Sequence, residues 1–128
     1  MDVNAEKLLL ALYAELNAKK PQMNAAAQNM GLAGDTLGRA VNALYAARLV
    51  SGVSVKFGDE DENPATVITD NITLTRRGAA QGDKLLGLDA EASAIQKLRN
   101  IVARAAEPGW EGVKAIAERA LKEQMETG

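Results

Sequence analysis

The stretch that decides the expected fold is AGDTLGRAVNALYAARLV, residues 33–50. Its large apolar residues recur at spacings of four and three, the period of one face of an α-helix: Leu37, Val41 and Leu44. Gly34 and Asp35 precede this pattern and are suited to the start of a helix. β-Branched residues follow Arg48, so the helix is expected to end near that residue.

The segments on both sides of residues 33–50 complete a known order of elements. A short helix is expected over residues 24–30, and Gly31 supplies the left-handed residue that closes it. Alternating apolar and polar residues predict a strand over 49–57 and a return strand over 65–74. Helix, tight connection, helix and a two-stranded wing is the order of a winged helix-turn-helix, with residues 33–50 as its recognition helix. The predicted fold class is therefore mostly α with a small β-hairpin wing (α+β).

A first helix is predicted over residues 2–18. One apolar stripe of this helix is expected to pack on the stripe of residues 33–50: Leu9, Leu12 and Leu16. Leu8 and Tyr13 are placed at the edges of that stripe. The return strand of the wing is expected to bend at Asp70 and Asn71.

After the wing, Thr75 is expected to cap a further helix. Glycines in and after this helix are interpreted as caps and close-packing positions: Gly78, Gly82 and Gly87. A next helix is expected to open at Leu88 and Asp89, and the last one at Trp110. The predicted organisation is a winged helix-turn-helix domain over 1–88, followed by a C-terminal two-helix extension over 89–128.

The two C-terminal helices carry more large apolar residues than a domain of this size is expected to cover: Ile95, Leu98, Ile101, Val102, Trp110, Val113, Ile116 and Leu121. An exposed apolar patch on a protein without membrane segments usually meets a partner, and a second copy of the same chain is the commonest one. A homodimer through the C-terminal helices is therefore predicted. In the alternative, both helices fold back onto the first helix and the protein is a monomer.

Composition restricts the possible functions. The chain of 128 residues contains no histidine and no cysteine, which removes the commonest general base, the commonest metal ligand and thiol chemistry. We therefore expect no enzyme, no cofactor, no metal site and a cytoplasmic location, with no membrane segment. The net charge of −2 argues against a strongly basic nucleic-acid binder but leaves room for a local basic patch.

Candidate DNA contacts lie on the outward face of residues 33–50 and around the wing. Arginine can donate two hydrogen bonds to guanine, asparagine can pair with adenine, and alanine allows close approach to the major groove. The predicted base-reading face comprises Thr36, Arg39, Asn42 and Ala43, and the predicted phosphate contacts are Lys56, Arg76 and Arg77. Any solvated helix face carries some arginine and asparagine, so that alternative stays open.

The expected wing tip, GDEDENP at residues 58–64, argues against DNA. Asp59, Glu60, Asp61 and Glu62 lack the alternate spacing of a calcium loop and would repel phosphates in a DNA complex. They favour a basic protein partner at the wing tip. The alternative function is thus a winged helix used for protein–protein contact, such as a phage accessory or anti-defence factor.

Three segments resemble the YjcQ-like winged-helix proteins of bacteria and their prophages. The first runs from Met30-Gly31-Leu32 through Ala40–Leu44 to Leu49–Val53, the second is Ile72–Gly78, and the third is Gly109-Trp110. The resemblance implies a small phage-associated winged-helix protein and supplies no catalytic residues. Combined with the order of elements, it leads us to expect a sequence-specific DNA-binding transcriptional regulator that acts on double-stranded DNA as a homodimer.

Overall fold

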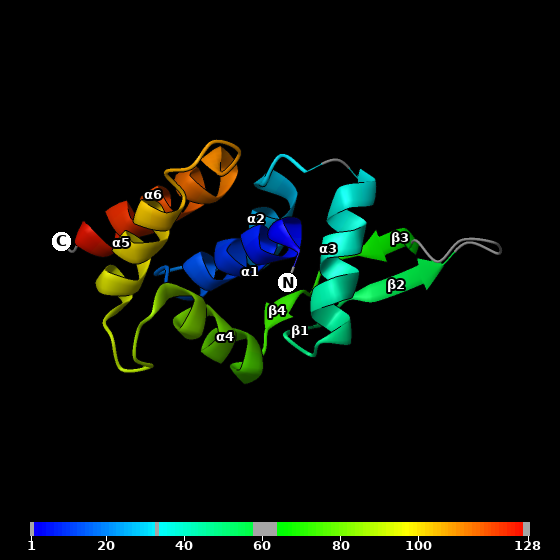
Figure 1. The fold of residues 1–128 in the computed structure, drawn as a ribbon, viewed down its shortest axis with the longest axis horizontal. Helices are drawn as coiled ribbons and strands as arrows, with labels where there is room; N and C mark the ends of the chain where they lie inside the picture. The colour runs from blue at the N-terminus through cyan, green and yellow to red at the C-terminus, as the bar shows by residue number, and fades with distance from the viewer. Residues whose placement is uncertain (1, 33, 58–63, 127–128) are drawn as a thin grey trace.

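The computed structural model describes residues 2–32, 34–57 and 64–126, and for residues 55–57 and 64–67 it describes the backbone only. The described residues form mostly helices, with two short pairs of antiparallel strands (Figure 1). In chain order the elements are α1 (Val3–Leu16), α2 (Met23–Asn29), α3 (Gly34–Ala46), β1 (Val50–Ser51), β2 (Ser54–Phe57), β3 (Pro64–Ile68), β4 (Thr73–Leu74), α4 (Arg76–Leu86), α5 (Ala94–Arg104) and α6 (Glu111–Met125). The expected α+β class with a predominance of helix is confirmed.

Helix α1 is the centre of the molecule. It lies between the α5–α6 pair and the half that contains α3 and the strands, and it contacts α2, α3, α4 and α6 (Figure 1). Residues 8–15 are all buried, so the prediction of a single apolar stripe was wrong. Leu8 and Tyr13, placed at the edges of the stripe, are fully buried, whereas Leu16 is 41% exposed. A helix that is apolar on every side is enclosed by its neighbours, and the run from Leu8 to Ala14 is apolar without interruption.

Helices α2 and α3 follow the predicted order. Gly31 has a φ of +77° after α2, as expected of the left-handed closing residue. Val41 and Leu44 of α3 are fully buried against α1, and Leu37 is half-buried. The predicted apolar face of α3 is therefore confirmed.

The strands pair as β1 with β4 and β2 with β3, both antiparallel. The predicted bend at Asp70 and Asn71 is confirmed: both lie in a turn between β3 and β4, where Ile72 N donates to the Thr69 carbonyl at 3.1 Å. Gly52 lies opposite this turn with a φ of +74°, and a Cβ there would lie only 1.9 Å from the Asn71 carbonyl oxygen. The close approach requires glycine.

Helix α4 begins as predicted. Thr75 Oγ1 accepts a hydrogen bond from Gly78 N at 3.0 Å, and Gly87 ends the helix in the left-handed region. The predicted start of the next helix was wrong, because α5 begins at Ala94 and not at Leu88 or Asp89. Ser93 is its cap, with Oγ accepting from Gln96 N at 3.1 Å.

Helices α5 and α6 pack on each other, and α6 also packs along α1 (Figure 1). Most large apolar residues of these two helices are buried inside the chain: Leu98, Ile101, Trp110, Val113 and Ile116. The premise of a large exposed patch was therefore wrong, because α1 offers a second apolar side to α6. A smaller apolar surface remains at half-buried Val102 and Leu121 and at Met125, which is 57% exposed. The boundary at residue 88 and the homodimer stay predictions.

Candidate nucleic-acid interface

One side of α3 carries the four residues that are predicted to read bases. Arg39 and Ala43 are exposed, and Thr36 and Asn42 are half-buried beside them. These residues lie at three- and four-residue spacings opposite Val41 and Leu44, which fix the helix on α1. The structure therefore brings the four predicted base-reading residues to one side of α3.

Arg76 and Arg77 are exposed in the first turn of α4, which is tied to the end of α3. Thr75 Oγ1 donates to the Arg48 carbonyl at 2.8 Å, and Thr75 N donates to the Leu49 carbonyl at 3.0 Å. These two hydrogen bonds hold the start of α4 against the residues that leave α3. The two predicted arginines are thereby placed next to Arg48.

Arg48 is a candidate that the sequence interpretation did not include. It follows α3 at the position where a left-handed residue closes the helix: Leu49 N donates to the Leu44 carbonyl at 2.9 Å and Arg48 N to the Tyr45 carbonyl at 3.0 Å. Its φ is +62°, in the region that glycine adopts at no steric cost. In the sequence, Arg48 marks only the residue near which the helix was expected to end; its left-handed conformation and its exposure are visible only in the structure.

Charge is unevenly distributed along the chain. Residues 36–57 and 71–88 hold six of the 15 Lys and Arg residues but only one of the 17 Asp and Glu residues. The six cations are Arg39, Arg48, Lys56, Arg76, Arg77 and Lys84. The single acid, Asp83, is buried and faces Tyr13 and Lys97. The exposed charges of these two segments are therefore positive wherever the structure describes them, although Asp35 is exposed at the start of α3.

Ion pairing separates the two halves of the molecule. On α5 and α6, all cations except Arg99 have a carboxylate partner among the described residues: Lys97, Arg104, Lys114, Arg119 and Lys122. By contrast, no carboxylate in the described ranges forms an ion pair with Arg39, Arg48, Arg76 or Arg77. Among the residues that the structure describes, these four arginines of the α3–α4 side therefore have no carboxylate that competes with an external anion.

Two predictions about the wing lie outside what the structure describes. The backbone of Lys56 pairs with Thr66 in the β2–β3 hairpin, but the Lys56 side chain is not described. The acidic tip, with Asp59, Glu60, Asp61 and Glu62, also falls outside the described residues. Neither the phosphate contact of Lys56 nor the effect of the acidic tip is tested.

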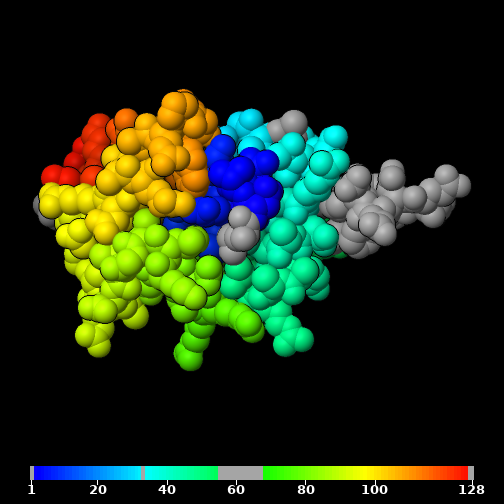
Figure 2. All heavy atoms as spheres, viewed as in Figure 1, coloured from blue at the N-terminus to red at the C-terminus, as the bar shows by residue number. Residues whose placement is uncertain are grey.

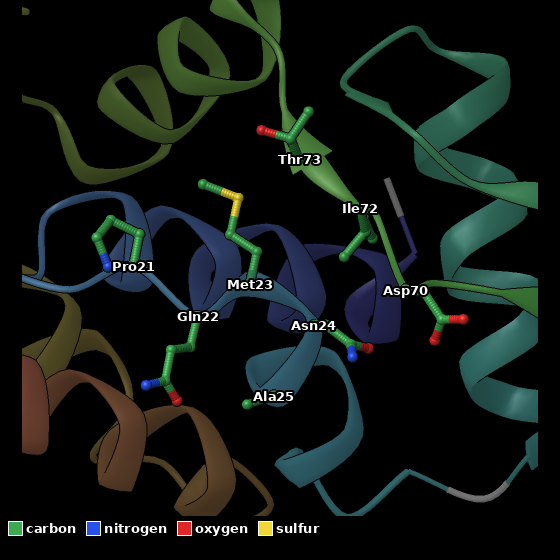
Figure 3. Close-up of a pocket in the computed structure, with 8 residues that line it drawn as sticks. All are labelled: Pro21, Gln22, Met23, Asn24, Ala25, Asp70, Ile72 and Thr73. Carbon is green, nitrogen blue, oxygen red and sulfur yellow. The ribbon is translucent and has the colours of Figure 1, made fainter.

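An open pocket of about 540 Å³ lies between the start of α2 and β4 (Figure 3). Met23 and Asn24 line it from α2, and Asp70, Ile72 and Thr73 line it from the other side. Met23 and Asn24 are already engaged: Met23 Sδ accepts from Leu74 N at 3.3 Å, and Asn24 Oδ1 accepts from Thr69 Oγ1 at 3.2 Å. Among the described residues that line this pocket, Asp70 is the one ionisable residue, so they offer no acid–base pair.

Two buried polar clusters were also missed by the sequence interpretation. Tyr13 donates its hydroxyl proton to Asp83, and Lys97 Nζ lies 3.5 Å from Asp83 Oδ1 and 5.6 Å from the centre of the Tyr13 ring. Burial, with a further contribution from Asp83, raises the pKa of Tyr13 well above its usual value. Glu15, fully buried in α1, is paired with Arg119 and accepts from Gln22 N at 2.9 Å. Both clusters join α1 to neighbouring helices.

Comparisons of the chain with protein-family models, curated proteins and solved structures find no match. The resemblance to YjcQ-like proteins therefore stays a prediction. No helix within the described part of the chain is both long and apolar enough to span a membrane.

Proposed function

We propose that this protein is a winged helix-turn-helix regulator that binds double-stranded DNA in a sequence-specific manner, with α3 in the major groove. The observation that carries the proposal is the concentration of exposed cations on the α3–α4 side, beside a helix face of small and hydrogen-bonding residues. DNA affinity depends on neutralising phosphates, and specificity depends on contacts with base edges. This side of the molecule offers residue types for both.

Each element has a role in this proposal. Arg39 and Asn42 read base edges, and Ala43 leaves room for α3 to approach the groove. Arg76 and Arg77 bind phosphates beside α3, and Lys56 does so from the hairpin. The order α1–α2–α3 followed by a strand hairpin supports the winged-helix interpretation, with Gly31 making the tight connection between α2 and α3.

The homodimer remains part of the proposal. Between α5 and α6, an open apolar groove of about 470 Å³ is lined by Val102, Leu121 and Met125 and bordered by Lys114 and Glu118. Pairing two copies across this groove would place two α3 helices for two half-sites. Sedimentation of the full chain tests this proposal: a monomer at tens of micromolar would overturn the dimer.

The experiment that tests DNA binding is selection from a random duplex library at low salt, followed by affinity measurements on the enriched sequence. We expect one motif to be enriched, and Arg39→Ala to lose about 1–3 kcal/mol of specific affinity and to relax the preference at one base pair. Arg99→Ala, which removes an exposed arginine on α5, is the matched control and should bind like the wild type. If no sequence is enriched, the proposal fails and the protein-interaction alternative takes its place.

A further inference from the structure

The exposed side of α4 carries only positive charge. Arg77, Gln81 and Lys84 follow at spacings of four and three residues, so they lie along one face of the helix. The opposite face is held against the core: a Cβ at Gly82 would lie 2.5 Å from the Tyr13 ring, and one at Gly78 would lie 2.2 Å from the Leu49 carbonyl oxygen. The orientation of α4 is therefore fixed, and its cations are directed away from the core.

Arg48 adds a fourth cation to Arg76, Arg77 and Lys84, at a cost in backbone energy. A side chain at φ +62° is disfavoured, and glycine is the usual residue where a helix closes in this way. Because the Arg48 carbonyl accepts from Thr75 Oγ1, its backbone is fixed to the start of α4. In Figure 2 the segments that end α3 and begin α4 project from the same edge of the molecule.

The spacing of these cations suits a nucleic-acid backbone. Arg77 and Lys84 are seven residues apart, which is about 10 Å along a helix. One strand of B-DNA has a phosphate every 3.4 Å or so along the axis, so this length covers about three phosphates. Arg77 and Lys84 can therefore meet different phosphates of the same strand.

We propose that Arg48, Arg76, Arg77 and Lys84 form a continuous track that binds the sugar-phosphate backbone of DNA next to the segment read by α3. The proposal rests on the proposed function and extends it, because Arg48 and Lys84 become contacts that are independent of sequence. The track sets affinity and orientation, and α3 sets sequence preference. An acidic protein surface is the competing occupant and is distinguished by the test.

The decisive variants are Arg48→Gly and Lys84→Gln. Glycine adopts the backbone conformation of residue 48 without strain, so the melting temperature of Arg48→Gly should equal or exceed that of the wild type. A loss of binding by this variant therefore cannot be explained by misfolding. Arg99→Gln, on the distant helix α5, is the control for the removal of an exposed cation.

The measurement is the dissociation constant for the selected duplex between 0.05 and about 0.3 M salt. In each variant the plot of log affinity against log salt should become less steep by about 0.9. If binding at 1 M salt is unchanged, this difference means about eightfold weaker binding at 0.1 M salt. The loss should be the same on an unrelated duplex, and Arg99→Gln should keep the wild-type slope.

The outcomes separate the two proposals. If the wild type binds no duplex, the proposed function fails and the track fails with it. If the wild type binds its selected duplex but Arg48→Gly and Lys84→Gln keep the wild-type slope, only the track is overturned. If the wild type binds polyglutamate more tightly than DNA, and Arg48→Gly abolishes that binding, the occupant is an acidic protein and the assignment to DNA is overturned.

Discussion

Replacing Gly82 by alanine tests how tightly α4 is held on α1. On helix propensity alone, Gly82→Ala should stabilise an internal helical position by about 1 kcal/mol. In the structure, however, the new Cβ would lie 2.5 Å from Tyr13 Cδ2 and 2.9 Å from Tyr13 Cγ, whereas carbon atoms in contact prefer about 3.5–4.0 Å. The ring would have to move by about 1 Å, against its hydrogen bond to Asp83 and the surrounding core.

We expect Gly82→Ala to reduce the free energy of unfolding by about 1–3 kcal/mol, because overpacking outweighs the gain in helix propensity. Urea unfolding followed by circular dichroism measures this change. Gly34→Ala is the control, because a Cβ at that helical position meets no described atom within 4 Å, and it should be neutral or stabilising. Stabilisation by Gly82→Ala equal to that of the control would refute the packing of α4 on Tyr13.

Two further predictions concern the buried polar clusters. The raised pKa of Tyr13 means that its contribution to stability is complete below the ordinary tyrosine value of about 10 and is lost as the pH rises further. Tyr13→Phe should therefore be less stable than the wild type at pH 7 but should lose less stability between pH 9 and about 11. The midpoints of urea unfolding measure both changes. Parallel plots of midpoint against pH for the variant and the wild type would contradict this prediction. Arg119→Met leaves the Glu15 carboxylate buried, with Gln22 N as its remaining partner. The free energy of unfolding should fall by about 2–4 kcal/mol. This loss is smaller than the loss expected when a fully buried ion pair is broken, because Arg119 is half exposed. Adding Glu15→Gln should recover part of that loss, and simple additivity of the two changes would show that the pair is not coupled.

The parts of the fold that local patterns determine could be predicted from the sequence. The face of α3, the closing residue Gly31 and the cap at Thr75 depend on residues a few positions apart, and all three predictions are confirmed. The burial of α1 on every side could not be derived in this way. It depends on α6, which begins about a hundred residues later and covers the side that a smaller domain would leave exposed.

The candidate interface could be predicted only in part, for a similar reason. Arg39 and Asn42 follow from helical spacing alone, so their common face was predictable. The position of Arg48 depends on a left-handed backbone conformation and on its contact with Thr75, which is 27 residues away. A sequence pattern carries no direct sign of such a contact.

The order of synthesis gives the burial of α1 a consequence for folding. The most enclosed helix is made well before α6, and contacts that cover it come from far along the chain, as in the pairs of Glu15 with Arg119 and of the Asn17 carbonyl with Gln124. A nascent chain therefore carries an apolar helix without its full cover until about residue 125 has been added. We expect the growing chain to expose this helix to chaperones and to neighbouring chains during translation, and native packing to form only after α6 has been synthesised.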